Sequence, residues 1–508
     1  MRRIMKAALF SLLFAALFGT GAQSQTINAA SCNTNDVQSA LNSIATDGTT
    51  VNIPAGTCTW TSGVTYTQTN SFTIQGAGNT TGSDGLGNPT GYNDQTIMVL
   101  NFNGAIFNIT TIAGKSLRIS GLSIKGGAGI TYNGVLDIGG PSQSSTSSPL
   151  FRMDHNHFYN YQSGTAAAVL WGWMYGVVDH NLWDLGQGNV TNGTRIIHDG
   201  WGGYQNGAGS WHSPINWGSV EAMYFENNTY NYAAANDCNN GGRQVYRYNT
   251  FNYSFLQAHE GPVQGCRSIE MYNNNFTEGA QSTNPVQYYM RMGSVLSWNN
   301  SVTGAGNALE FHYDRSEGPG CGHPQSAPPN GLGYCGTTYG PSNWDQNGDS
   351  SGHLCMNQTG AGSGDLLQGY FPTLCDASSS DCTNGIYTGR WPNQIQEPVY
   401  EWLNNYTSVS NIVGIGTCSN AALFKQNRDY YLYTGSFAGA SGVGSGLLSA
   451  RPSTCTPLVA YWATDTNTLY QCATTNTWTA YYKPYTYPHP LDTSGSPAPP
   501  TNLQATPY

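Results

Sequence analysis

Charged side chains are scarce in this sequence, and most of the basic ones lie in one stretch. Only 9% of the 508 residues are charged, with 18 Lys and Arg against 28 Asp and Glu. Beyond residue 24, seven of the eleven arginines and seven of the ten histidines fall between 152 and 315, whereas all four lysines fall outside. If the protein carries out acid–base chemistry, we expect it in this stretch and not with Lys as the base.

A short repeat runs through the same stretch: an alternating strand is followed by Asn, any residue and a large apolar residue. The marker asparagines are Asn156, Asn181, Asn228, Asn249, Asn274 and Asn300. They are 25, 47, 21, 25 and 26 residues apart, and we interpret 47 as two turns with one copy unrecognised. This period, combined with alternating strands, predicts a coil of three short strands per turn, in which the markers form an inward hydrogen-bonded ladder.

Register in such a coil predicts two columns of outward side chains. The residues two before each marker are Asp154, Asp179, Glu226, Arg247, Tyr272 and Trp298. On the preceding strand the corresponding residues are Trp171, Trp217, Asp237, His259, Arg291 and His312. The first column is interpreted either as a solvated face, on which Glu226 pairs with Arg247, or as a carboxylate or calcium site beside aromatic platforms.

The second column is typical of a groove that holds a sugar chain. Planar rings pack against the apolar faces of pyranoses, and charged groups fix the orientation of the sugar. Trp201, in a long flanking loop, and Arg243 are further candidates for substrate binding, although Arg243 is equally suited to tying a turn.

The N-terminal residues predict export. Arg2, Arg3 and Lys6 precede an apolar run over 7–17 and a small-residue site over 22–24, which is the pattern of a signal peptide covering 1–24. No later stretch has the length of a membrane span. We therefore expect a secreted protein without a transmembrane span, and a monomer. A net charge of -10 argues against nucleic acid as a partner.

All twelve cysteines lie beyond the predicted signal peptide, which favours disulfides in an oxidising compartment. Connectivity does not follow from the sequence alone, but three pairs are suggested by their places in the chain. These pairs are Cys32 with Cys58, Cys238 with Cys266, and Cys455 with Cys472.

The chain divides into a long coil and a small C-terminal part. We expect the coil over 25–450, opened by a capping helix near 37–44 and interrupted by a Gly-, Pro- and Cys-rich insertion at about 316–395. Residues 451–491 are interpreted as a small aromatic module, either a cap on the last turn or a sugar-binding module. A Pro-rich tail follows over 492–508. The predicted fold is all-β.

The capping helix followed by GTTVNIPAGTCTW, and then the Asn-marked turns, resembles the pectate-lyase-like superfamily of secreted bacterial right-handed parallel β-helix proteins. The resemblance covers about 30–415. It implies the pectin lyase fold and a polysaccharide substrate. The superfamily also contains hydrolases, esterases and non-catalytic adhesins, so the fold alone does not define the reaction.

Among lyases of this superfamily, YYMRMGSVLSWNNSV is similar to the strand that carries a catalytic Arg. The resemblance implies β-elimination from an acidic, uronate-containing glycan. His259 would be the base, Arg291 would hold the carboxylate, Tyr289 would donate the proton, and Asp237 is a candidate catalytic residue that could bind calcium. The Lys that those lyases use one turn earlier has no counterpart here.

Two alternatives stay open. A glycoside hydrolase of the same fold needs two carboxylates, and the available pairs are Asp237 with Glu260 and Asp179 with Glu226. A non-catalytic carbohydrate-binding protein, similar to an adhesin, needs only the groove.

Overall fold

The structure is a computed structural model, and parts of the chain are described. These are residues 25–127, 133–139, 150–161, 166–186, 192–197, 210–211, 213–239, 241–258, 265–278, 286–291, 293–312, 359–360, 362, 382–383, 386–387, 395–416 and 424–492. The predicted signal peptide, most of the predicted insertion and nearly all of the Pro-rich tail lie outside these ranges.

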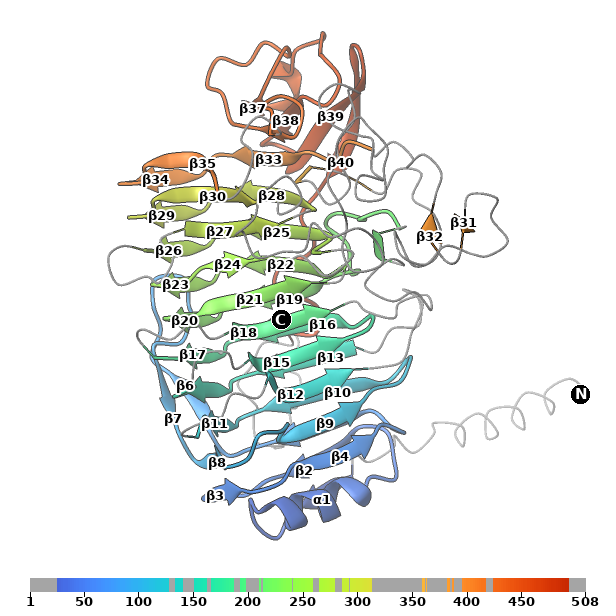
Figure 1. Cartoon of the computed structure of the whole chain (residues 1–508), viewed down its shortest axis with the longest axis vertical. Helices are drawn as coiled ribbons and strands as arrows, with labels where there is room; N and C mark the ends of the chain where they lie inside the picture. The colour runs from blue at the N-terminus through green and yellow to red at the C-terminus, as the bar shows by residue number, and fades with distance from the viewer. Residues whose placement is uncertain are drawn as a thin grey trace, which may run out of the picture.

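Three long parallel sheets make up most of the molecule (Figure 1). Sheet A contains β1 (Thr26–Asn28), β2 (Thr49–Asn52), β5 (Phe72–Gln75), β10 (Ser116–Ser120), β13 (Leu150–Asp154), β16 (Tyr175–Asp179), β19 (Met223–Glu226), β22 (Arg243–Arg247), β25 (Ser268–Tyr272), β28 (Ser294–Trp298), β33 (Val399–Trp402) and β36 (Tyr430–Tyr431). Sheet B contains β3 (Gly56–Trp60), β8 (Thr96–Leu100), β11 (Ser123–Lys125), β14 (His157–Tyr159), β17 (Leu182–Asp184), β20 (Thr229–Asn231), β23 (Thr250–Asn252), β26 (Asn275–Thr277), β29 (Ser301–Thr303) and β34 (Asn405–Thr407).

Sheet C consists of two runs of parallel strands. Isolated β-bridges join the two runs, and one of these bridges pairs Cys238 with Ala258. Its strands are β4 (Val64–Thr67), β9 (Phe107–Thr110), β12 (Asn133–Gly139), β15 (Ala166–Trp171), β18 (Asn192–Ile197), β21 (Ala234–Asn239), β24 (Leu256–Gln257), β27 (Val286–Arg291), β30 (Asn307–His312) and β35 (Asn411–Ile415). From β2 to β35 the chain enters sheets A, B and C in the same order, turn after turn. The expectation of a mostly β protein with long parallel sheets is therefore confirmed.

The inner faces of the sheets share one apolar core, because alternate side chains of each strand point inward. α1 (Thr34–Asn42) lies at the N-terminal end of the sheets and buries Val37, Ala40 and Leu41 against this core. The disulfide between Cys32 and Cys58 joins the segment before α1 to β3.

The marker asparagines form the expected ladder. From Asn181 onward, each side-chain oxygen accepts from the backbone N–H and the side-chain amide of the Asn one turn earlier, as when Asn228 Oδ1 lies 3.0 Å from both nitrogens of Asn181. The ladder runs through Asn156, Asn181, Asn228, Asn249, Asn274, Asn300 and Asn404. The ladder satisfies polar groups that are sealed from water.

The interpretation of the 47-residue separation was wrong. Asn181 bonds directly to Asn228, and β16 pairs with β19, so the two markers lie on adjacent turns. The additional residues belong to a long connection over 198–222, between β18 and β19.

Smaller elements flank the coil. A hairpin of β6 (Asn79–Thr81) and β7 (Gly91–Asn93) lies beside sheet B, and β31 (Cys382–Thr383) pairs with β32 (Ile386–Tyr387). The C-terminal module is the four-stranded sheet of β37 (Val443–Gly446), β38 (Ala460–Ala463), β39 (Thr468–Thr474) and β40 (Thr477–Tyr482), with a short 3-10 helix (Leu448–Ala450). Cys455 and Cys472 form the expected disulfide within it.

Residues 483–492 leave the module and run back along the outer face of sheet A (Figure 1); we call this segment the C-terminal strap. Arg247 donates to the carbonyls of Tyr485 and Thr486, and Arg152 donates to the carbonyl of Leu491 and to Asp492. The strap therefore ties the end of the described chain to strands far earlier in the sequence. No helix in the described ranges has the length and apolarity that a membrane crossing requires.

Candidate functional site

A group of hydrogen-bonded polar side chains lies on the outer face of sheet C, on β27 and β30. Strand alternation places Tyr289 and Arg291 outward, since Tyr288 and Met290 lie in the core. In the same way, Glu310 and His312 point outward on either side of Phe311, which is a core residue. Register pairs Tyr289 with Glu310 and Arg291 with His312.

These side chains form a continuous relay. Tyr289 Oη lies 2.9 Å from His312 Nδ1 and accepts a hydrogen bond of 2.9 Å from Arg291 Nη2. On the far side of the imidazole, His312 Nε2 lies 2.7 Å from Glu310 Oε1. The order of the relay is therefore Glu310, His312, Tyr289 and Arg291.

Neighbouring groups hold the relay in place. Asn307 donates to Glu310 Oε2 at 2.6 Å, and Asn411 donates to Asn307 Oδ1 at 3.0 Å. Gly416 lies against the imidazole of His312, and a Cβ there would be 2.0 Å from His312 Cε1. Only glycine leaves room for the ring in this position.

Packing also orients the tyrosine ring. The ring centroids of Tyr289 and His312 are 3.7 Å apart, and the Arg291 guanidinium lies 4.7 Å from the Tyr289 centroid. Tyr289 and Arg291 are half-buried, whereas His312 is 7% exposed. Tyr289 and Arg291 are thus partly accessible to solvent, whereas His312 is nearly sealed from it.

This arrangement is suited to proton transfer at Tyr289 Oη. The hydrogen bond from His312 is the main reason that the pKa of Glu310 lies below its ordinary value, so the carboxylate stays ionised at neutral pH. An ionised Glu310 accepts a hydrogen bond from Nε2–H of His312. In this tautomer Nδ1 carries no proton and is able to take the proton of the phenol. The positive charge of Arg291 stabilises the resulting phenolate.

The structure brings three predicted site residues together, namely Arg291, Tyr289 and His312. Sequence reasoning did not select Glu310, although its spacing of two residues from His312 was a usable signal. His259 and Trp201 lie outside the described residues, and the same holds for the side chain of Trp171.

Asp237 lies on the same face as the relay but not within it. Its column runs through Gln257 to Tyr289, so it is two strands away, or about 10 Å at a strand spacing of about 4.8 Å. It is 4% exposed. Among the described residues, the cluster of metal-ligand types with suitable spacing is Asp179, His180 and Asp492, which does not include Asp237.

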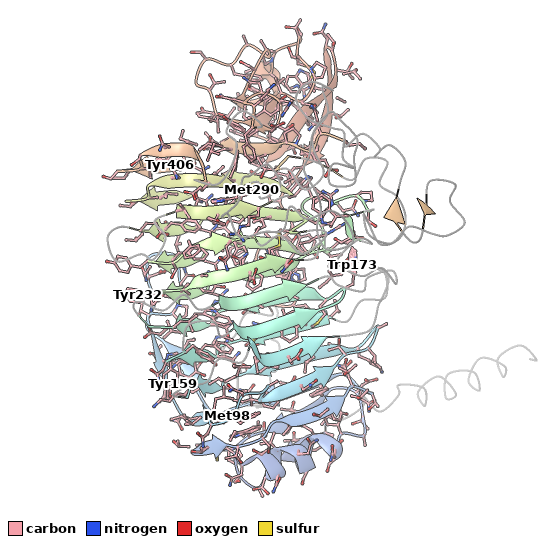
Figure 2. All side chains as sticks on the ribbon, viewed as in Figure 1. Met98, Tyr159, Trp173, Tyr232, Met290 and Tyr406 are labelled. Atoms are coloured by element: carbon pink, nitrogen blue, oxygen red, sulfur yellow. A yellow bond between two sulfur atoms is a disulfide. The ribbon has the colours of Figure 1, made fainter. Side chains whose placement is uncertain are left out.

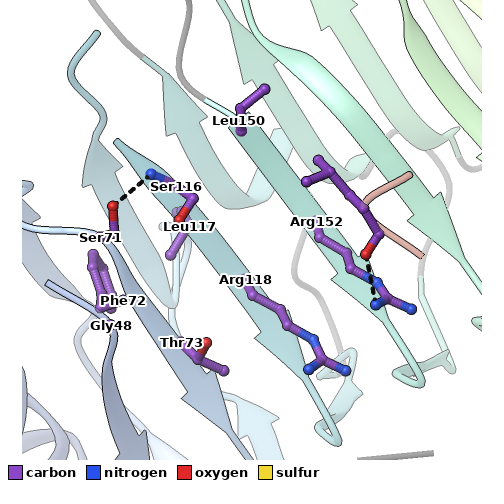
Figure 3. A pocket seen from close by; sticks show the side chains of 10 residues that line it. Gly48, Ser71, Phe72, Thr73, Ser116, Leu117, Arg118, Leu150 and Arg152 are labelled. Atoms are coloured by element: carbon purple, nitrogen blue, oxygen red, sulfur yellow. Dashed lines mark hydrogen bonds between the residues drawn. The ribbon is translucent and has the colours of Figure 1, made fainter. Parts of the chain in front are cut away.

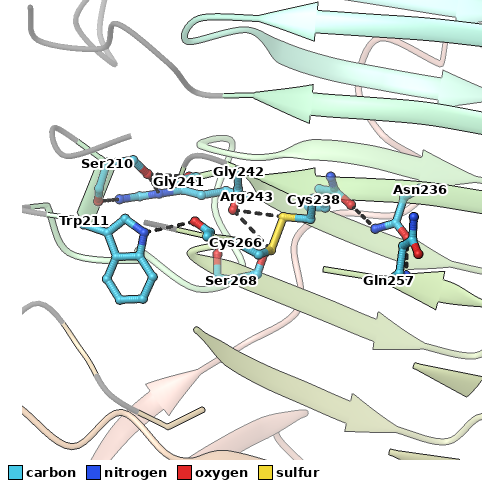
Figure 4. The surroundings of a disulfide bond; sticks show 12 residues. Ser210, Trp211, Asn236, Cys238, Gly241, Gly242, Arg243, Gln257, Cys266 and Ser268 are labelled. Atoms are coloured by element: carbon cyan, nitrogen blue, oxygen red, sulfur yellow. Dashed lines mark hydrogen bonds between the residues drawn. A yellow bond between two sulfur atoms is a disulfide. The ribbon is translucent and has the colours of Figure 1, made fainter. Parts of the chain in front are cut away.

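The roles expected for Arg243 and Trp217 are not supported. Arg243 is 1% exposed and donates to Ser210 Oγ and to the carbonyls of residues 210, 213, 214 and 215. It therefore ties a turn (Figure 4) beside the disulfide of Cys238 with Cys266, which is present as expected. Trp217 lies in the long connection before β19, away from sheet C, and donates to Tyr481 Oη of the C-terminal module.

The first predicted column is stacked in register on sheet A, but this face is not exposed to solvent. All six side chains are at most 7% exposed, because the C-terminal strap and module cover them. The expected pairing of Glu226 with Arg247 is present at 2.6 Å. Near Asp179, the guanidinium of Arg152 forms ion pairs with the carboxylates of Asp179 and Asp492. Both carboxylates are therefore already paired with a positive charge.

A cavity of about 210 Å³ opens on sheet A where the strap ends (Figure 3). Leu150 and Leu491 line it together with Arg118 and Arg152. Both guanidiniums are already paired with carboxylates, Arg118 with Asp154 and Arg152 with Asp179. Because β10 and β13 belong to sheet A, this cavity is separate from the relay on sheet C.

The fold and site thus define a mostly β protein with long parallel sheets and a tyrosine-centred relay. No protein-family model and no curated protein matches the chain. Among solved structures, the chain is similar to an alginate lyase from Paenibacillus sp. str. FPU-7, with 14% sequence identity and a TM-score of 0.35. The similarity covers 56% of this chain and 90% of that one.

Proposed function

We propose that this protein is a secreted polysaccharide lyase that cleaves uronate-containing glycans by β-elimination. The observation that carries the proposal is the relay from Glu310 through His312 to Tyr289 Oη, with Arg291 bonded to the same oxygen. β-Elimination needs a base next to a carboxylate, a cation for the charge that develops, and an acid for the leaving oxygen.

In this proposal Tyr289 takes over the role that His259 had in the sequence analysis. Once His312 has accepted its proton, the phenolate removes the proton next to the uronate carboxylate. Arg291 binds that carboxylate. Glu310 acts as a positioning residue, since it holds His312 in the tautomer whose Nδ1 faces the phenol.

The proposal includes the fold and the compartment. We propose that the chain, which passes through the three sheets in turn, is a right-handed parallel β-helix of the pectate-lyase-like superfamily, with α1 as its N-terminal cap. Three disulfides among the described residues and the signal-peptide pattern of 1–24 support secretion. The substrate is an acidic polysaccharide.

The burial and spacing of the described carboxylates disfavour a glycoside hydrolase. Asp179 and Glu226 are buried under the strap. Of the other predicted pair, Asp237 with Glu260, Glu260 lies outside the described residues. Asp237 and Glu310 are three strands apart, or about 14 Å, whereas hydrolases place their two carboxylates about 5 to 9.5 Å apart. A non-catalytic binding protein remains the outcome if no product forms.

The test is to incubate the purified protein with a panel of uronate polysaccharides and to follow the absorbance of unsaturated uronides. We expect Tyr289→Phe and Arg291→Ala to lower the rate by about 10²-fold or more. The matched control is Tyr253→Phe, because Tyr253 is a half-buried tyrosine stacked on Tyr232, away from the relay. Full activity in Tyr289→Phe would reject this site.

Glu310→Gln separates positioning from a structural role. Without the carboxylate, His312 loses the acceptor that fixes its tautomer, so we expect kcat to fall while KM stays nearly unchanged. A change in thermal stability with an unchanged kcat would contradict the relay.

A further inference from the structure

The proton path of the relay ends on a single oxygen. Glu310 and His312 lie on one side of Tyr289 Oη and Arg291 donates to the same atom, so both proton transfers of an elimination would pass through this phenol. We infer that the site takes 4-linked uronates of mannuronate or glucuronate configuration and cleaves them by syn elimination. This inference rests on the proposed lyase function.

Sugar stereochemistry connects one oxygen with this substrate class. In 4-linked mannuronate and glucuronate, the hydrogen on C5 and the oxygen on C4 project from the same face of the ring. In guluronate and galacturonate they project from opposite faces. A group held on one side of the sugar reaches both atoms only in the first class, whereas the second class needs an acid and a base on opposite sides.

The step balances on the residues that the site supplies. The Tyr289 phenolate takes the proton from C5, and the electron pair of that C–H bond becomes the C4–C5 double bond. The C4–O bond breaks, and the departing oxygen receives the proton from Tyr289 Oη. The phenolate is regenerated, and no oxidant, reductant or water is consumed.

The position of Arg291 fits this geometry. It lies two residues from Tyr289 on the same outward face of β27, and its guanidinium contacts both the phenol oxygen and the ring. A carboxylate on C5 that pairs with Arg291 therefore brings the C5 hydrogen next to Tyr289 Oη. Among the described residues, Asp237 is the carboxylate that precedes Tyr289 along the column; it lies about 10 Å away and does not reach the leaving oxygen.

The experiment compares four polymers under identical conditions: poly-mannuronate, 4-linked glucuronan, poly-guluronate and polygalacturonate. We expect unsaturated uronide from one or both of the first two, at a kcat/KM at least about 10²-fold above that for the last two. Tyr289→Phe should abolish the reaction on the preferred polymer, and Tyr253→Phe should retain it.

The outcomes are distinguishable. Faster Tyr289-dependent cleavage of guluronate or galacturonate would overturn the syn assignment and leave the lyase proposal standing. No unsaturated product from any of the four polymers, together with none from the wider panel, would overturn the lyase proposal itself.

Discussion

At the scale of single residues, Glu270 is a buried carboxyl between sheet A and the C-terminal module. It is 3% exposed, and its Oε1 accepts a hydrogen bond of 2.7 Å from the Gly218 backbone. Burial raises the pKa of Glu270 from 4.5 to about 7. The folded protein therefore holds this proton more tightly than the unfolded chain does.

This shift predicts a loss of stability as the pH rises. The stabilisation is fully present below the unfolded pKa of 4.5 and is lost as the pH passes the folded value of about 7. Between about pH 5 and about pH 8, the wild-type protein should lose more of its free energy of unfolding than the Glu270→Gln variant does. The difference between the two losses should be on the order of 2 kcal/mol. Urea denaturation at the two pH values measures this, and equal pH dependence in both proteins would contradict it.

Part of the site was predictable at this scale. Arg291 and His312 were selected because they belong to the predicted outward column, and Tyr289 was selected as a proton donor for the elimination. The structure brings the three together. Glu310 follows from the same alternation but was not selected. For Arg243, the turn-tying alternative agrees with the structure, but nothing local in GGRQVY shows that the segment tied is 210–215.

At the scale of elements, the C-terminal strap depends on buried charges. Arg247 and Glu226 are both fully buried, and Arg247 also holds two strap carbonyls. Contacts that span more than 230 residues have no signature in a local pattern, so the strap was not predictable. The strands of sheets A and B near the markers were predictable, because each is followed by the same Asn motif.

Breaking the pair on one side should be costly. Arg247→Met leaves the Glu226 carboxylate buried, and we expect a loss of about 3 to 5 kcal/mol in the free energy of unfolding. The double variant with Glu226→Met should lose less than the sum of the two single losses, in a double-mutant cycle measured by urea denaturation.

The control for this cycle is the exposed pair of Lys115 with Asp47, at 2.7 Å. Lys115→Met should cost less than about 1 kcal/mol, because water screens the pair. Equal losses at the two pairs would show that burial is not the cause.

At the scale of the whole molecule, the asparagine ladder links one turn to the next. Asn228 Oδ1 accepts from two nitrogens of Asn181, and its amide donates to the carbonyls of Val178 and Glu226. Asn228→Ala leaves these groups buried without partners, at a cost of about 3 kcal/mol. Hydrogen exchange should accelerate at the turns on either side.

The matched variant is Asn231→Ala. Asn231 is half-buried on the same turn and accepts one side-chain bond from Asn252. We expect a loss below about 1 kcal/mol, since water replaces that bond. A comparable loss at both positions would mean that the ladder does not stabilise the stacking.

The long parallel sheets followed from the spacing of the markers, because a constant period stacks equivalent residues. The number of turns did not follow, since a long connection between Asn181 and Asn228 imitates a missing turn. The separation between two marker asparagines gives only the length of chain between them, whereas the number of turns depends on which strands pair.

The C-terminal strap also imposes an order of events during synthesis. Arg152, Glu226 and Arg247 leave the ribosome well before residues 485–492, whose backbone and carboxylate complete their bonding. Until translation reaches that point, the charged side chains on β13 to β22 stay exposed to water, even if the turns of the coil that carry them have already stacked. A nascent chain released before residue 485 would thus expose a row of charged side chains along one side.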